Sequence, residues 1–191
     1  MNKDEKKSIQ KELKKDKLKK ANYKWVFKIT IVAFFLSIFF SLISESLIPK
    51  VNIVIGILIL IIFILIGIIF DMIGVAVQSA DEAPFHSMNS RKIKGAKEAS
   101  MFIKNADKFS SFCNDVIGDI CGIISGTAGS IIALSIARKF NLDSFIITLI
   151  VTGIISAITI GGKAYFKSIA INKSNYILYN FARMIVKFKE M

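Results

Sequence analysis

Long apolar runs alternate with polar, Lys-rich segments along this chain. In residues 51–70 every side chain except Asn52 and two glycines is Ile, Leu, Val or Phe, and none is charged. At about 1.5 Å per residue, a helix of this length spans about 30 Å, the thickness of a hydrocarbon core. Its insertion into a bilayer is favourable by roughly 5–10 kcal/mol. The run therefore predicts a transmembrane helix.

Similar apolar runs occur three more times, and charged residues, Pro or Gly mark their ends. The predicted spans are residues 25–47, 51–77, 115–137 and 143–162. Segments 84–112 and 164–188 mix apolar positions with Lys and Arg, which is typical of helices that lie on a membrane surface. We expect an all-α integral membrane protein, with four transmembrane helices and cytoplasmic amphipathic juxtamembrane helices.

Lys and Arg are distributed unevenly between the two sides of these spans. Residues 1–24 hold ten, segments 78–114 and 163–191 hold six each, and the two short loops together hold three. The positive-inside rule then places both termini in the cytoplasm of a protein of the cell (inner) membrane, with residues 1–24 as a basic cytoplasmic N-terminal arm. Topology, together with anionic lipid at the basic flanks, accounts for the net charge of +12, so no nucleic acid partner is expected.

Catalytic chemistry has little support in the sequence. The single His, His86, has no obvious Ser or Cys partner, and Cys113 and Cys121 form no disulfide framework. A nucleotide-binding loop, a Gly-rich phosphate motif and an HExxH motif are all missing from the sequence. We therefore do not expect an enzyme.

Several polar residues interrupt the second predicted span. Helical spacing places Asp71, Gln78 and Glu82 on nearly one face, with Ser79 beside them. Because a carboxylate inside a membrane costs about 2.5–3.5 kcal/mol, such a face should contact other protein or a water-filled cavity.

The third predicted span combines small and acidic residues. Gly118, Gly122 and Gly126 form two overlapping GxxxG units, the pattern that allows close approach of another helix. Asp115 and Asp119 share the face of these glycines. One interpretation is a packing seam with interfacial acids. The other is a seam that also lines a site for a hard cation such as magnesium, which prefers oxygen ligands.

Lys163 follows two glycines at the end of the fourth predicted span. Its ammonium group either extends to the membrane interface or pairs with Asp119, which is expected at a similar depth.

Four short motifs follow one another between Asp71 and Phe188. They are S-A-D-E-A at 79–83, G-A-K-E-A at 95–99, I-G-D at 117–119 and G-K-A-Y-F-K-S-I-A at 162–170. In order and spacing this part of the chain resembles the transmembrane domain of the CorB and cyclin-M family of magnesium transporters. The resemblance implies a CorB-like transmembrane domain over 51–191, preceded by an extra transmembrane helix at 25–47.

The resemblance also implies a homodimer and a magnesium site made by a Ser, an Asn and a Glu. These ligands fall on Ser79, Asp119 and Lys163, and a second family serine falls on Val75. A lysine ammonium has only donors and cannot bind a cation. With Asp115 as a further oxygen donor, the candidate metal ligands are Ser79, Asp119 and Asp115.

Two functions follow from these residues. The first is divalent-cation transport, of magnesium or cobalt, by a small CorB-like dimer. The alternative is a non-transporting, degenerate homologue that acts as a membrane assembly or regulatory partner, with an Asp119–Lys163 ion pair in place of the metal.

Overall fold

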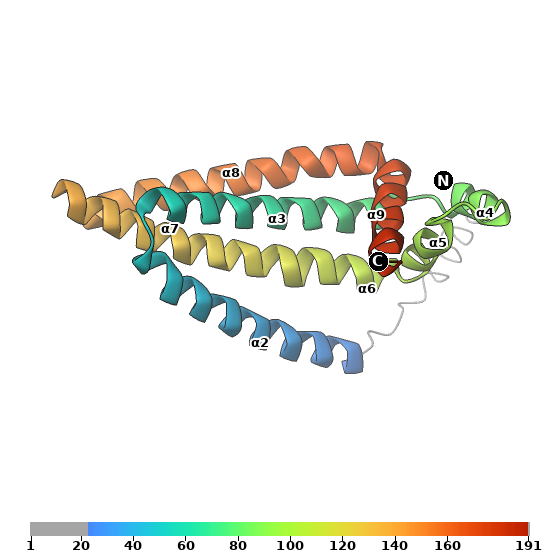
Figure 1. The fold of residues 1–191 in the computed structure, drawn as a ribbon, viewed down its shortest axis with the longest axis horizontal. Helices are drawn as coiled ribbons and strands as arrows, with labels where there is room; N and C mark the ends of the chain where they lie inside the picture. The colour runs from blue at the N-terminus through green and yellow to red at the C-terminus, as the bar shows by residue number, and fades with distance from the viewer. Residues whose placement is uncertain (1–22, 191) are drawn as a thin grey trace, which may run out of the picture. The chain divides into compact units, whose positions relative to one another are not determined.

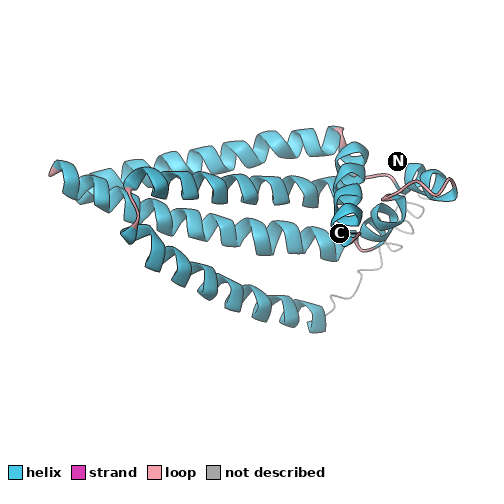
Figure 2. Cartoon of the chain, viewed as in Figure 1, coloured by secondary structure: helices cyan, strands magenta, loops and turns pink. Residues whose placement is uncertain are grey.

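The computed structural model describes residues 23–190, and every element in that range is helical (Figures 1 and 2). The predicted N-terminal arm lies almost wholly outside the described residues. The helices are α2 (Tyr23–Leu47), η1 (Ile48–Lys50), α3 (Ile53–Ser79), α4 (Glu82–Ser90), α5 (Ala96–Lys104), α6 (Ala106–Ser111), η2 (Phe112–Gly118), α7 (Asp119–Phe140), α8 (Ser144–Asn172) and α9 (Ser174–Lys189). The chain divides after Val32 into two compact units, and all contacts described below lie in the second.

Four of the helical stretches in residues 23–190 are long and apolar enough to cross a membrane. They are Tyr23–Lys50, Ile53–Ser79, Ala106–Phe140 and Ser144–Asn172. The all-helical fold and the number of membrane-length helices predicted from the sequence are therefore confirmed.

Polar side chains define where the apolar helices begin. Asn52 Oδ1 accepts a hydrogen bond from the Val54 amide at the start of α3, at 3.3 Å. Asp143 Oδ1 accepts from the amides of Phe145 and Ile146 at the start of α8, at 2.8 and 3.1 Å. These caps satisfy backbone N–H groups that have no partner within the helix.

Helices α3, α7 and α8 pack on one another around an apolar core (Figure 1). Its buried members are Ile48, Leu60, Ile64, Ile68, Ala128 and Ile132. Helices α3 and α7 run in opposite directions, because Gly56 faces Ile132 near one end and Gly67 faces Cys121 further along. Small residues at these contacts let the two backbones approach closely.

A second buried cluster joins the other end of α3 to α4, α5 and α9. Its members are Ile73, Val77, Phe85, Ala99, Leu178 and Ala182. The rings of Phe102, Phe109 and Phe181 pack beside it, with centroids 4.5–5.8 Å apart. Helix α9 lies across this end of α3 rather than along it (Figure 1).

The ends of the third and fourth spans differ from the prediction. Residues 106–111, which were predicted to belong to the membrane-surface segment 84–112, begin the third long helix, which continues through the π-helical segment η2. Helix α8 does not stop at Gly162 but extends to Asn172, so the separate tail helix begins at Ser174 and not at 164. A glycine costs a helix only about 1 kcal/mol, and residues 163–172 contain no further glycine or proline.

Candidate charged site between α3, α7 and α8

Asp71 is the one acidic side chain of residues 23–190 that is buried. It lies on α3 with 4% of its side chain exposed, and Lys167 Nζ of α8 approaches its Oδ2 atom to 3.2 Å. This distance makes an ion pair, but the direction of approach does not make a hydrogen bond, and Oδ2 has no other hydrogen-bond partner. A buried carboxylate oxygen without a hydrogen bond is costly, so the attraction of the ammonium carries the stabilisation.

A second buried acceptor lies one helical turn away. The Asn114 side chain, on η2, donates from Nδ2 to Ser110 Oγ at 3.2 Å, whereas its Oδ1 has no hydrogen-bond partner. Oδ1 lies against Gly74, where a Cβ atom would overlap it. Because Asp71 and Gly74 are about 4.5 Å apart along the axis of α3, two unsatisfied acceptor oxygens face the same part of the bundle.

The second acid–lysine pair lies between α7 and α8. Lys163 Nζ is 3.9 Å from Asp119 Oδ1, at the outer limit of an ion pair. The Lys163 side chain is 21% exposed and that of Asp119 is 69% exposed. A Cβ atom at Gly118 would lie 3.5 Å from Lys163 Nζ, so this glycine leaves room for the ammonium.

The candidate metal ligands do not converge within one chain. Ser79 is the exposed last residue of α3, twelve residues after Gly67, and Gly67 is level with Gly118. This separation corresponds to about 18 Å along the helix. Asp115 is exposed on η2. Within residues 23–190, no three His, Cys, Asp or Glu side chains lie close enough together to hold a metal ion.

The predicted polar face of the second span is wrong at its C-terminal end. Ala80 and Asp81 have extended backbone conformations, so Glu82 begins the separate helix α4. There its carboxylate lies 3.0 Å from His86 Nε2, one turn later on the same helix. Gln78 is exposed like Ser79, so Asp71 is the one residue of this predicted polar face that is buried in the bundle.

The three glycines of the predicted seam, Gly118 at the end of η2 and Gly122 and Gly126 on α7, have different surroundings. Gly118 lies beside Gly67 and Lys163, but a Cβ atom at Gly122 or Gly126 would meet nothing within 4 Å. Both line a groove of about 170 Å³ between α7 and α8. Its other residues, all on α8, are Thr152, Ile155, Ser156, Thr159 and Ile160. The predicted close-packed seam is therefore formed by Gly118 alone of the three, and the other two leave an open surface.

Sequence reasoning missed two residues of this site. Lys167 is one turn after Lys163, so both ammonium groups leave α8 on one face, and this spacing was the available signal. Asn114 fell between the predicted surface segment 84–112 and the predicted third span 115–137, because nothing in the sequence marks the π-helical segment that carries it. Together Asp71, Asp119, Lys163 and Lys167 form a site whose formal charges sum to zero.

The chain was also compared with known proteins. No family model, no curated protein and no solved structure matches it. The comparisons therefore assign it to no family, and the likeness to the CorB and cyclin-M family stays a prediction from the sequence.

Proposed function

We propose that this chain is a multi-pass membrane protein that does not transport ions and acts in membrane assembly, with its charged site closed by lysines. The single observation that carries this function is the pairing of two acids with ammonium groups of α8, Asp71 with Lys167 and Asp119 with Lys163. In this proposal α2, α3, α7 and α8 cross the cell membrane and both termini are cytoplasmic.

Electrostatics explains why such a site disfavours a divalent ion. Magnesium is held by several oxygen ligands whose negative charge offsets its own. Asp71 and Asp119 each already have a lysine partner, and an ammonium cannot replace an oxygen ligand. A divalent ion would have to displace both lysines from a partly buried position.

The exposed face of α7 supports assembly with a second copy. Asp119, Gly122 and Gly126 lie at i, i+3 and i+7, and therefore on one side of the helix. A carboxylate that is mostly uncovered in one chain is costly beside lipid, and two glycines with open space allow another helix to approach. Lys163 of α8 lies beside this face, and a surface with both an acid and a lysine suits a two-fold contact, in which each copy offers the partner charge of the other.

A second candidate is divalent-cation transport, and one observation favours it. Asp71 Oδ2 and Asn114 Oδ1 are both buried acceptors without a hydrogen bond. Two such oxygens on facing helices are the start of an oxygen-ligand site, which a cation would complete if Lys167 moved away.

Magnesium flux into proteoliposomes separates the two candidates. We expect the native chain to give no more flux than empty vesicles under any magnesium gradient. Flux that exceeds the empty vesicles, and that Asp71→Asn abolishes while Asp115→Asn does not, would establish transport and overturn the proposed function. Asp115 is the suitable control because it is an exposed acid close to Asn114 in sequence.

A further inference from the structure

Helix α9 has two different sides. Leu178 and Ala182 are fully buried on its inner side, in the cluster with Ile73 and Val77 of α3. Its outer side is exposed along the helix. The inner side of α9 therefore contacts the rest of the protein, and its outer side is free to contact solvent or lipid.

The position of α9 along α3 gives its depth relative to the apolar span. Ile73 and Val77 follow Phe70, the last residue of the uninterrupted apolar run, by three and seven residues. These intervals correspond to about 4.5 and 10 Å along the helix axis. The polar layer of a bilayer is about 5–8 Å thick on each side of its hydrocarbon core. The contacts of α9 with α3 therefore begin within the depth of the lipid headgroups, at Ile73, and end just outside it, at Val77.

The outer side of α9 carries apolar and basic residues on adjoining faces. Met184 is 49% exposed and Phe188 is 71% exposed. At 100° per residue, Arg183 and Lys187 lie about 100° around the helix from these two. Both basic residues are exposed, and neither forms an ion pair with another described residue.

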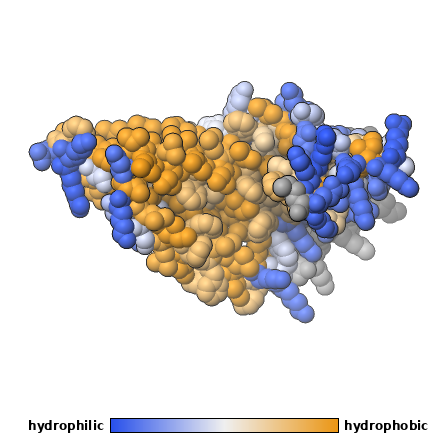
Figure 3. Space-filling view, viewed as in Figure 1, coloured by the Kyte–Doolittle hydropathy of each residue, from blue (hydrophilic) through white to orange (hydrophobic). Residues whose placement is uncertain are grey.

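The surface around α9 is continuous with that of the apolar helices. Figure 3 shows a hydrophobic surface along the long helices, and hydrophilic side chains gathered at the end that carries α4, α5 and α9. Helix α9 lies at the boundary between these two zones because it crosses the last turns of α3.

We infer that α9 is an interfacial helix that binds anionic phospholipid, with Met184 and Phe188 among the acyl chains nearest the headgroups and Arg183 and Lys187 on the lipid phosphates. This inference rests on the proposed membrane insertion and orientation. Exposed apolar side chains beside basic ones fit a lipid surface, which offers both acyl chains and phosphates. An acidic protein partner would bind the basic residues but would leave Met184 and Phe188 without an apolar contact.

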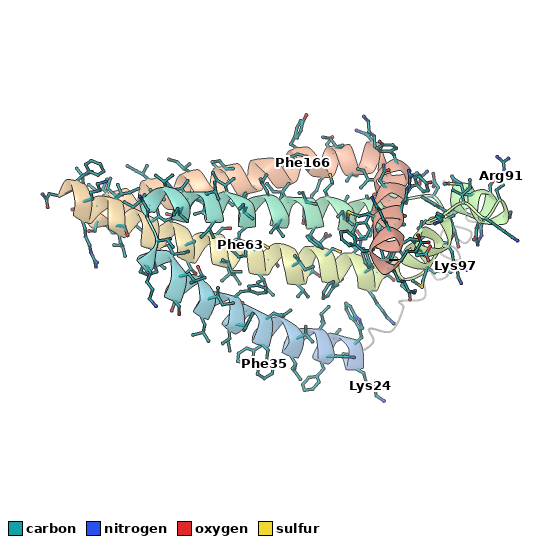
Figure 4. All side chains as sticks on the ribbon, viewed as in Figure 1. Lys24, Phe35, Phe63, Arg91, Lys97 and Phe166 are labelled. Atoms are coloured by element: carbon teal, nitrogen blue, oxygen red, sulfur yellow. The ribbon has the colours of Figure 1, made fainter. Side chains whose placement is uncertain are left out.

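Fluorescence quenching by brominated phospholipid tests the depth of α9 in the reconstituted full chain. Trp25 is the only native Trp, so its quenching in the native chain reports on membrane insertion itself. In the double variant Trp25→Phe, Met184→Trp, we expect quenching by lipids brominated near the headgroup. The matched variant Trp25→Phe, Arg91→Trp should not be quenched, because Arg91 lies on the side of α9 away from the long helices (Figure 4).

Quenching of Trp25 without quenching of Met184→Trp would overturn the inference and leave the proposed insertion standing. Quenching of neither position would overturn both.

Vesicle composition tests the basic residues. We expect the thermal midpoint of the native chain to be higher in phosphatidylcholine vesicles that contain phosphatidylglycerol than in phosphatidylcholine alone. Arg183→Gln, Lys187→Gln should lose most of this increment, whereas Arg91→Gln, Lys97→Gln, which removes the same charge beyond α9 (Figure 4), should keep it. An equal increment in the two double variants, or none in the native chain, would refute phosphate binding by α9. Capture of an acidic protein by α9 in a lipid-free assay, without a vesicle effect, would also refute it.

Discussion

Lys167 Nζ lies 3.2 Å from Asp71 Oδ2 in an ion pair whose two members differ in burial. Nearly half of the lysine side chain is exposed, whereas the aspartate is enclosed by the bundle. The ammonium can therefore return to water when its partner is removed, but the carboxylate cannot. This asymmetry makes the contribution of each residue separable by substitution.

Lys167→Met should destabilise the protein more than Asp71→Asn. We expect a loss of about 2–3 kcal/mol for Lys167→Met, below the roughly 3–5 kcal/mol of a fully buried pair because the lysine is half exposed. Asp71→Asn should cost about 1 kcal/mol, since it removes the buried charge and leaves an ammonium that water can reach. Thermal unfolding in detergent, followed by circular dichroism, measures both.

Lys173→Met is the control for this comparison, because Lys173 is exposed beyond the end of α8. The double variant Asp71→Asn, Lys167→Met should be less destabilised than Lys167→Met alone. Equal losses for the two single variants would show that burial of Asp71 does not determine the energetics of the pair.

Lys163→Glu should create a magnesium-dependent stabilisation that the native chain lacks. The substitution replaces the ammonium beside Asp119 with a second carboxylate, and two carboxylates attract a hard divalent cation. We expect the melting midpoint of the variant to rise with added magnesium. The melting midpoint of Lys163→Gln, which removes the positive charge without adding an acid, should change little when magnesium is added. A native chain whose midpoint itself rises with magnesium would argue against closure of the site by lysines.

Gly126→Leu should weaken self-association while leaving the single chain folded. Its new side chain enters the open groove between α7 and α8, where a second copy is proposed to pack. We expect association between labelled copies, measured by energy transfer in vesicles, to fall by about tenfold or more, equivalent to about 1.4 kcal/mol.

Gly129→Leu provides the matched contrast on the same helix. A Cβ atom at Gly129 would overlap Ile155, so this variant should lower the free energy of unfolding through overpacking by about 1–3 kcal/mol. If Gly126→Leu associates as strongly as the native chain, then the α7 face is not the contact between copies.

Gly95→Ala should loosen the attachment of α9. Gly95 has a φ of 90°, and a Cβ atom there would lie 3.0 Å from the Arg183 backbone nitrogen. Strain in this left-handed conformation costs about 1–2 kcal/mol, and the backbone of α9 must also shift. We expect faster hydrogen exchange in α9, measured by mass spectrometry. Gly161→Ala is the control, since a Cβ atom meets nothing there, and it should leave exchange in α9 unchanged.

The apolar runs were enough to predict the membrane-length helices but not their ends. The hydrophobic pattern shows where a run of apolar residues ends. A helix ends at a different place, where its backbone hydrogen bonds are interrupted. Helix α8 therefore continues past Gly162 to Asn172, and the third long helix begins at Ala106, before its apolar part. Conversely, α3 stops at Ser79 although Glu82 continues its polar spacing, because Ala80 and Asp81 are extended.

The site was predicted in part for a related reason. Asp119 and Lys163 could be matched because each ends or begins an apolar run at a similar depth. Asp71 was recognised as unusual, but its partner Lys167 lay in a segment that appeared to belong to a surface helix. The position of Asn114 against Gly74 depends on the rotation that η2 gives to α7 relative to α3, and no pattern of apolar residues encodes that rotation.

Lys163 and Lys167 project from a single unbroken helix, with about 6 Å between neighbouring turns of its surface. A movement of the helix backbone as a whole shifts both side chains together. Sliding or rotating α8 would therefore open both acid–lysine contacts in one movement, and the bundle would gain two bare carboxylates at once.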